Sequence, residues 1–349
     1  MNIIKLILLA SLSCLLLNPL ALQAGEFKDS TLTHIKYPAW FINTPFLELN
    51  EDLANARANG KQGLMVVYST EGCSYCGLFI QKSLGDPEIA ALVRKHFDSV
   101  GLEIFDDTIL VGPRGQETTV KEFAKQQGVM FSPTILFYDN NGKRVLRITG
   151  YQSPERFKTS LTYVTGKHYQ SQSMADYVKR SARIQARPAT STSLKQDPLF
   201  AKPPYLLQRN IIPASQPLLV IFEQADCEEC DIFHNKVLAD KQVRESLKKY
   251  EVVRLNSRDD KSVFITPDGS RMTPAMWYQQ EGFSRTPALL FFSERGHAAI
   301  KTDNLVLQQR MMNSINYMNE QAYLKGWSYQ RFARSKAIER NLKKAGREK

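Results

Sequence analysis

Short apolar runs alternate with polar turns and helix-like stretches along most of the chain. Two of these runs, 64–68 and 218–222, are rich in β-branched and aromatic residues and have the length of buried strands. A polar turn and a stretch with apolar residues at helical spacing follow each run. Further along, the apolar runs 134–138 and 288–292 each begin after a proline and lead through a glycine-containing turn into another strand. This order predicts a layered α/β fold.

The two halves of this pattern are copies of one another. Cys73 and Cys227 are 154 positions apart (227 − 73 = 154), and the same offset separates Pro133 from Pro287. The register holds without a gap from about residue 64 to about residue 146. Further pairs at this offset are Cys76 and Cys230, Phe79 and Phe233, Asp86 and Asp240, Gly128 and Gly282, and Gly142 and Gly296. Such a repeat predicts two domains with the same fold.

The first residues have the order of a secretory signal. Lys5 supplies a positive start, residues 3–22 are almost wholly apolar, and Ala24 offers a small residue for cleavage. We therefore expect residues 1–24 to be a signal peptide that is removed on export. A retained membrane anchor is the alternative.

Composition shifts predict the remaining boundaries. The segment 167–204 is polar, rich in small residues and punctuated by prolines, which is typical of a linker. We expect it to separate a first domain, 25–166, from a second domain, 205–320. A tail, 321–349, then completes the chain.

The positive charge of the protein is concentrated in this tail. The 349-residue chain has a formal net charge of +11, and residues 321–349 contribute seven of it (9 basic − 2 acidic = 7). Aromatic and aliphatic residues such as Trp327 and Leu342 are interleaved, so the tail is predicted to be a basic amphipathic helix. Such a helix either packs on the second domain or docks on an anionic membrane surface or an acidic partner. We expect no nucleic-acid partner.

Four cysteines remain once the signal peptide is removed. They form two tight pairs, Cys73 with Cys76 and Cys227 with Cys230. An even number of cysteines in an exported protein fits disulfide chemistry. Because a Cys-x-x-Cys disulfide closes too short a loop to constrain the unfolded chain much, we expect redox-active pairs rather than structural staples.

The first pair lies in Glu71-Gly72-Cys73-Ser74-Tyr75-Cys76, between a strand and a helix, and a strand-opening proline follows 57 residues later (133 − 76 = 57). The second copy repeats this spacing (287 − 230 = 57). This arrangement resembles the thioredoxin superfamily, in particular the soluble thioredoxin-like domains of periplasmic thiol:disulfide interchange proteins. The resemblance covers about 46–166 and 205–320. It implies two tandem thioredoxin-like α/β domains, each a central mixed β-sheet flanked by helices, plus the basic C-terminal helix.

The resemblance also implies roles for the cysteines. At the start of a helix, Cys73 is favoured as a thiolate, because free backbone N–H groups and the positive end of the helix dipole stabilise its charge. Cys73 then attacks a substrate disulfide and Cys76 resolves the mixed disulfide. Cys227 and Cys230 take the same roles in the second copy.

In the thioredoxin family the strand-opening proline is cis and lies against the cysteine pair. Carried over, these prolines are Pro133 and Pro287. The preceding residues, Ser132 and Thr286, are then expected to present backbone groups to an extended substrate.

The second pair differs from the first in its surroundings. Ser74-Tyr75 is neutral, whereas Glu228-Glu229, with Asp226 before and Asp231 after the pair, brings four acids. Negative charge disfavours a thiolate. We therefore predict a higher pKa for Cys227 than for Cys73, and a more reducing second pair.

The chain also departs from thioredoxin itself, which keeps a buried aspartate six residues before the first cysteine. Val67 and Ile221 occupy those positions. The departure favours a dedicated exchange partner over a general reductase.

The predicted function is therefore a periplasmic thiol–disulfide oxidoreductase of the protein-disulfide reductase or isomerase type. Its partners are protein thiols and disulfides and a protein electron donor or acceptor. No nucleotide or flavin motif is visible, so no cofactor is expected. Two alternatives remain open: the second domain is a binding or adapter module without redox catalysis, or Cys227, Cys230 and His234 handle a metal. The first copy has Ile80 at the position of His234, so the motif is not repeated. We therefore predict that the protein has no metal site.

Overall fold

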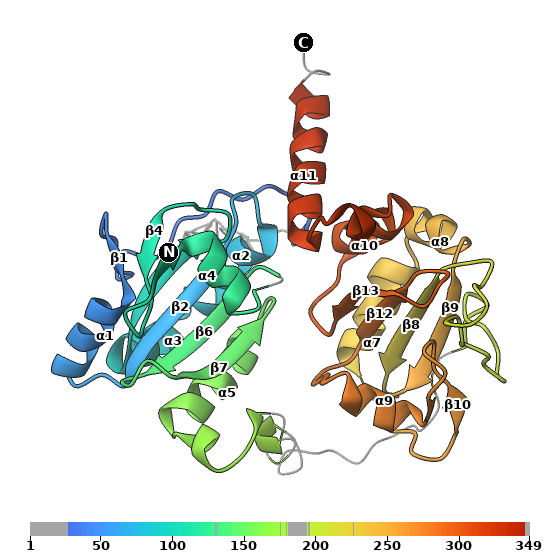
Figure 1. Cartoon of the computed structure of the whole chain (residues 1–349), viewed down its shortest axis with the longest axis horizontal. Coiled ribbons are helices and arrows are strands. Elements are labelled where there is room, and N and C mark those ends of the chain that lie inside the picture. Colours follow the sequence, from blue (N-terminus) through green and yellow to red (C-terminus); the bar gives the residue numbers. More distant parts are fainter. Residues whose placement is uncertain are drawn as a thin grey trace, which may run out of the picture.

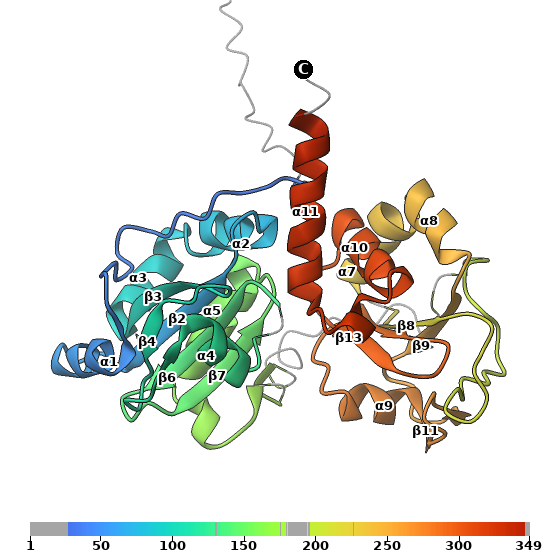
Figure 2. The same ribbon diagram turned by 45° about the horizontal axis from the view of Figure 1, so that its top comes forward.

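The computed structural model describes residues 27–129, 131–174, 176–178, 180, 194, 196–225 and 227–345. The predicted signal peptide, 1–24, lies outside them. Two α/β bodies lie side by side, and helix α11 (Tyr329–Ala345) stands between them and projects beyond both (Figure 1 and Figure 2). The layered α/β fold expected from the sequence is confirmed in both bodies.

The first body is built on a four-stranded mixed sheet in the order β3-β2-β6-β7. Its strands are β2 (Gly63–Ser69), β3 (Phe97–Glu103), β6 (Thr134–Asp139) and β7 (Arg144–Thr149). Strand β2 runs parallel to β3 and antiparallel to β6, and β6 pairs with β7 in antiparallel fashion. The strands predicted at 64–68 and 134–138 are confirmed.

Helices cover both faces of this sheet. They are α1 (Leu49–Ala58), α3 (Pro87–His96), α4 (Val120–Gln126) and α5 (Pro154–Thr165). Val67 packs in an apolar cluster with residues of α3 and α5, whereas its neighbour Val66 packs in another with residues of α1 and α4. Successive strand residues point to opposite faces, so a strand covered on both sides is apolar throughout its length.

The second body repeats this architecture, with a sheet in the order β13-β12-β8-β9. Its strands are β8 (Leu218–Glu223), β9 (Glu251–Asn256), β12 (Ala288–Phe292) and β13 (Ala298–Thr302). Its helices are α7 (Glu228–Phe233), α8 (Lys241–Leu247), α9 (Pro274–Gln280) and α10 (Gln308–Asn319). Val66 lies opposite Leu136 in the first sheet, and their repeat counterparts Val220 and Leu290 lie opposite each other in the second. The sequence repeat is thus a structural repeat down to the strand register.

Short elements complete the two bodies. They are β1 (Leu47–Glu48), β4 (Ile109–Val111), β5 (Glu117–Thr119), β10 (Phe264–Ile265), β11 (Arg271–Met272), π-helical turns at Phe79–Ser83 and His234–Leu238, and 3-10 turns at His168–Gln170 and Ala322–Lys325. The second body has no helix where α1 lies in the first. The equivalent stretch begins with Pro203 and Pro204, and the second of two prolines removes a backbone donor and disfavours helical geometry before it.

The hairpin turns predicted after β6 and β12 are present. Gly142 and Gly296 have φ angles of +70° and +77°, a region that favours glycine. Their amides donate to Asp139 O and Ser293 O and close the turns. In both copies a glycine therefore provides the positive φ that the hairpin turn requires.

The end of the predicted linker packs on the second body. Asp197 forms an ion pair with Arg244, and Phe200 contacts the apolar core there. The hydrogen bonds from Arg244 lower the pKa of Asp197 to about 2. The domain boundaries at 166 and 205 stay predictions.

Helix α11 fulfils the prediction of a helix in the tail, but it packs on both bodies rather than on the second alone. Tyr329 and Phe332 are buried in the core of the second body, while Arg334 lies against Phe105 and Glu103 of the first. Within the described part of the chain, no helix is long and apolar enough to cross a membrane.

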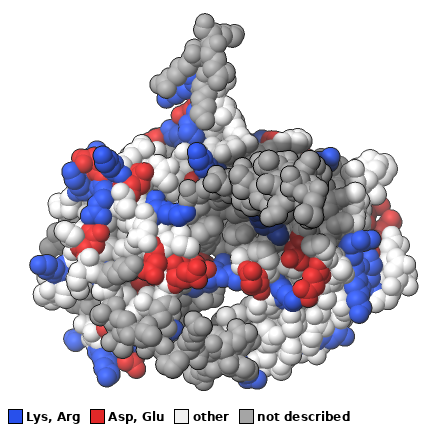
Figure 3. All heavy atoms as spheres, turned by 180° about the vertical axis from the view of Figure 1, so that it is seen from behind, with Lys and Arg blue, Asp and Glu red and all other residues white. Residues whose placement is uncertain are grey.

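Figure 3 shows basic and acidic side chains interspersed over one face of the molecule.

Candidate functional site

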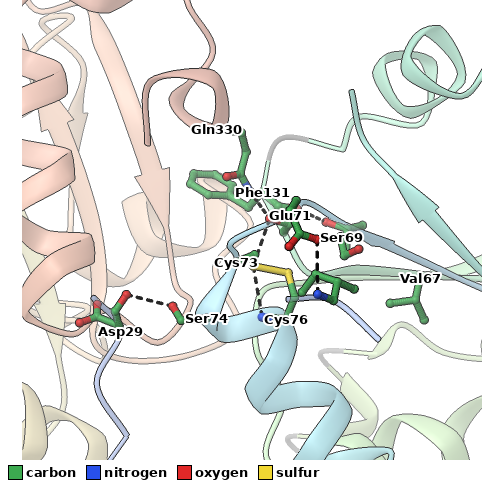
Figure 4. The surroundings of a disulfide bond; sticks show 12 residues. Asp29, Val67, Ser69, Glu71, Cys73, Ser74, Cys76, Phe131 and Gln330 are labelled. Atoms are coloured by element: carbon green, nitrogen blue, oxygen red, sulfur yellow. Dashed lines mark hydrogen bonds between the residues drawn. A yellow bond between two sulfur atoms is a disulfide. The ribbon is translucent and has the colours of Figure 1, made fainter. Parts of the chain in front are cut away.

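The first cysteine pair lies at the start of helix α2 (Ser74–Leu78), just after strand β2 (Figure 4). Cys73 is the N-cap of this helix, and it forms a disulfide with Cys76 in which the two Cα atoms are 5.3 Å apart. The amide of Cys76 donates to Cys73 Sγ at 3.2 Å. Because this amide points at the sulfur, it stabilises negative charge there once the disulfide opens.

The second pair has the same geometry. Cys227 is the N-cap of α7 and forms a disulfide with Cys230, with the Cα atoms 5.2 Å apart. The amide of Cys230 donates to Cys227 Sγ at 3.0 Å. In both bodies the second cysteine is buried one helical turn inside, whereas the first is partly exposed. The outer cysteine is therefore the one that a substrate can reach.

A proline loop lies against each pair. The Ser132–Pro133 and Thr286–Pro287 bonds are both cis, as predicted. Ser132 Oγ lies 3.4 Å from Cys73 Sγ, and Thr286 Oγ1 lies 3.3 Å from Cys227 Sγ. The structure thus brings together the predicted cysteine, serine or threonine and proline in each body. Substrate binding by these loops stays a prediction.

A family model described as a thioredoxin-like domain matches residues 49–165 and 208–317, which contain the two cysteine pairs and their proline loops. The chain belongs to the thioredoxin-like family. The expectation of two thioredoxin-like domains is confirmed, and two Cys-x-x-Cys disulfides in such domains support a thiol–disulfide oxidoreductase. No curated protein sequence matches the chain.

Several solved structures are similar to single thioredoxin-like domains of this chain. A thioredoxin-fold protein from Helicobacter pylori is 24% identical, with 36% of this chain and 87% of that chain covered and a TM-score of 0.31. A thioredoxin from Thermus thermophilus is 27% identical, with 36% and 88% covered and a TM-score of 0.28. A disulphide isomerase from Xylella fastidiosa is 17% identical, with 42% and 99% covered and a TM-score of 0.21.

The first pair is tied to the second thioredoxin-like domain through Tyr75, which lies between the two cysteines. Tyr75 Oη donates to Asp29 Oδ2 at 2.8 Å and accepts from the amide of Leu307 at 3.1 Å. The guanidinium of Arg310 lies 3.5 Å from the centre of the Tyr75 ring. Burial raises the pKa of Tyr75 well above its usual range, although Arg310 opposes the change, so the hydroxyl stays a donor.

Asp29 also caps a helix of the second domain. Its carboxylate accepts from the amides of Gln309 and Arg310 at 3.1 and 2.9 Å, at the start of α10. The N-cap residue of α10, Leu307, has no side chain that can do this. The part of the first domain that precedes β1 therefore joins the first pair to the second domain.

Helix α11 lies over the proline loop of the first site. Gln330 and Phe131 lie on the same side of the first cysteine pair (Figure 4). Gln330 Nε2 donates to Ser132 Oγ at 2.8 Å, and Tyr329 packs on Phe131 with ring centroids 5.2 Å apart. A pocket beside Cys73 is lined by Asp29, Arg310, Gln330 and Arg334 among others. Access to Cys73 is thus framed by residues from both ends of the chain.

Two arginines that the sequence reasoning did not place lie near Glu229 of the second pair. Glu229, between its cysteines, forms an ion pair with Arg156 of the first domain. Arg285 precedes Thr286 and donates to Gln152 Oε1 at 2.6 Å. Burial lowers the pKa of Arg285, and Arg156 lowers it further. Two positive charges therefore oppose the predicted acidic character of this site; Asp226 lies outside the described residues.

His234, the third residue of the metal alternative, is engaged elsewhere. Its Nε2 lies 2.8 and 3.0 Å from the two carboxylate oxygens of buried Glu223. Within the described residues, no group of three or more His, Cys, Asp or Glu side chains is arranged to hold a metal ion. Val67 and Ile221, at the positions of the thioredoxin aspartate, are buried in the apolar cores.

Sequence reasoning missed the residues that link the domains. Arg156 and Arg310 carried a signal, because they occupy the same position in the repeat (310 − 156 = 154). Asp29 and Gln330 lie outside the repeated parts, and no sequence pattern indicated that they contact the site. Their contacts with the first site depend on how the two domains and the termini dock.

Proposed function

We propose that this protein is an exported, periplasmic thiol–disulfide oxidoreductase that exchanges disulfides with protein substrates through both of its cysteine pairs. One observation carries the proposal: each outer cysteine is a partly exposed helix N-cap whose sulfur accepts a backbone hydrogen bond from the inner cysteine. This environment favours the thiolate, which is the attacking species in disulfide exchange.

The reaction at the first site follows from this geometry. In the reduced protein, the Cys73 thiolate attacks one sulfur of a substrate disulfide, and the other substrate sulfur leaves as a thiolate. A mixed disulfide now joins Cys73 to the substrate. Cys76, after losing its proton, attacks Cys73 Sγ and releases the second substrate thiolate, so the substrate gains two electrons and the pair becomes a disulfide. The reverse sequence oxidises a substrate dithiol.

The second pair is proposed to work in the same way, with Cys227 attacking and Cys230 resolving. Its N-cap geometry and its threonine next to the cis proline match the first site. The alternative, an adapter domain without redox catalysis, predicts that Cys227 never carries a substrate in a mixed disulfide.

Trapping tests both sites. Cys76→Ala and Cys230→Ala variants are expected to accumulate mixed disulfides with protein partners, because the resolving attack is lost. The measurement is non-reducing electrophoresis and mass spectrometry of the tagged full chain after acid quenching of cells. The captured proteins are expected to include substrates and the electron donor or acceptor.

Each trapping variant has a matched control. Cys73→Ala/Cys76→Ala and Cys227→Ala/Cys230→Ala remove the attacking sulfur as well and should capture nothing at that site. Capture by Cys76→Ala alone would support the adapter alternative for the second domain. Capture by neither would contradict the proposed activity.

The tail is proposed to dock the protein on an anionic membrane surface. Ile338 and Leu342 lie one turn apart on α11 and are exposed, with Lys343 beside them. An exposed apolar pair flanked by basic residues is the composition of an interfacial helix. The membrane face would then lie at the end of α11 that projects beyond both domains (Figure 2).

We expect Ile338→Ser/Leu342→Ser to weaken binding to vesicles of phosphatidylglycerol and phosphatidylethanolamine more than about fivefold, since two apolar side chains lose their burial in the bilayer. The measurement is co-sedimentation of the full chain. Ile211→Ser/Ile212→Ser removes an apolar pair elsewhere that is even more exposed, and this variant should bind as the unmodified protein does. Unchanged binding of the tail variant would remove the membrane role.

A further inference from the structure

The two domains meet in an interface with internal symmetry. Tyr75 and Glu229 occupy the same position between the cysteines of their copies (229 − 75 = 154). Tyr75 contacts Arg310 of the second domain, and Glu229 contacts Arg156 of the first. These two arginines are themselves counterparts in the repeat. Each redox motif therefore touches the same helix position of the opposite domain.

The residues near the symmetry axis confirm this relation. A residue on a two-fold axis meets its own counterpart. Gly150 and Asn304 are counterparts (304 − 150 = 154), and they lie so close that a Cβ atom on Gly150 would come within 2.4 Å of Asn304 Cγ. The contact of Arg310 with Tyr75 and that of Arg156 with Glu229 are therefore equivalent contacts, related by the pseudo-two-fold axis of the interface.

The two arginines differ in what surrounds them. Arg310 lies close to the Asp29 carboxylate, which bonds its backbone amide and the hydroxyl of Tyr75. Arg156 instead forms its ion pair with Glu229, an acid within the redox motif itself. Both side chains of this pair are partly exposed, with 38% of each accessible. Of these two counterparts, Arg156 is therefore the one that offsets a charge between two cysteines.

From this geometry we propose that Arg156 of the first domain is a positioning residue that sets the redox equilibrium of the Cys227–Cys230 pair in the second domain. The proposal rests on the proposed disulfide-exchange function. Glu229 disfavours the reduced pair, because its negative charge opposes the Cys227 thiolate. Arg156 neutralises this charge and so favours the reduced, dithiol form. One domain thereby adjusts the oxidising strength of the other.

The test uses the full chain with Cys73→Ser/Cys76→Ser, so that only the second pair titrates. Glutathione is the probe: two glutathione thiols become one glutathione disulfide while the Cys227–Cys230 bond is reduced to two thiols. Arg156→Gln is expected to lower the equilibrium constant for this reduction about three- to tenfold, and a tenfold change corresponds to about 30 mV. Lys158→Gln removes a positive charge two residues along α5 and should leave the constant unchanged.

Three further variants separate a charge effect from loss of structure. Arg156→Lys keeps the charge and should stay within about twofold of the unmodified protein. Glu229→Gln should raise the constant, because it removes the acid itself. Arg156→Gln/Glu229→Gln removes one charge of each sign and should return to within about twofold of the unmodified value.

Two results would overturn the proposal: an unchanged constant for Arg156→Gln, or equal falls for Arg156→Gln and Lys158→Gln. Should Arg156→Gln unfold, a constant for Glu229→Gln that does not rise overturns it as well. A second pair that never exchanges with glutathione would instead contradict the proposed function. The two failures are therefore distinguishable.

Discussion

Replacing Cys73 by serine is expected to slow disulfide exchange by the first pair more than about a hundredfold, because a serine hydroxyl is not ionised at neutral pH and cannot form a disulfide. The helix N-terminus and the amide of Cys76 stabilise a negative charge on the sulfur of Cys73. Neither can supply a nucleophile when the sulfur is gone.

The measurement is the rate at which the reduced full chain cleaves a fluorescent disulfide-linked peptide. A Cys227→Ser/Cys230→Ser background isolates the first pair. Cys76→Ser, the matched control, should still attack the peptide once and stop at the mixed disulfide. If Cys73→Ser cleaved the peptide at the unmodified rate, Cys73 would not be the nucleophile.

Replacing Tyr75 by alanine is expected to lower the free energy of unfolding by about 3–5 kcal/mol, the usual cost of truncating a large buried aromatic side chain. Tyr75 is 4% exposed, its ring packs on Phe27 and Arg310, and its hydroxyl bonds Asp29 and the amide of Leu307. The variant therefore loses apolar packing and the polar contacts that join the two domains. Equilibrium denaturation of the oxidised full chain, followed by circular dichroism, measures the effect.

Tyr75→Phe is the control that separates these contributions. It keeps the ring and removes only the hydroxyl, which leaves the amide of Leu307 without its acceptor and takes one of three donors from Asp29. This loss should cost about 1–3 kcal/mol. A Tyr75→Ala variant as stable as the unmodified protein would contradict the position of this side chain in the domain interface.

The sequence predicted most of the fold of each domain because the determining signals are local. Short apolar runs, as at 64–68, indicate buried strands. A glycine such as Gly142 indicates a turn that needs a positive φ. The constant offset of 154 residues, as between Cys73 and Cys227, then predicted the same elements in the second copy. Strands β3 and β9 and the π-helical turns were not predicted.

The charge environment of the second pair shows where local reasoning stops. Four acids near Cys227 and Cys230 predicted a more reducing pair, and that comparison with the first pair stays a prediction. What the sequence could not supply was Arg156, which reaches Glu229 from the other domain. Charge effects depend on distance in space, and neighbours in the sequence are only part of the surroundings of a side chain.

The sequence by itself determined that this protein has two copies of one α/β domain, each with a cysteine pair at a helix start and a proline opposite it. Spacing alone encodes these features, since a strand, a turn and a helix of given lengths can close on each other in few ways. Only the tertiary structure decided how the copies face each other. Asp29 meets Arg310, and Gln330 meets Ser132, because two folded domains and both ends of the chain dock through complementary surfaces, and no spacing along the chain records that docking.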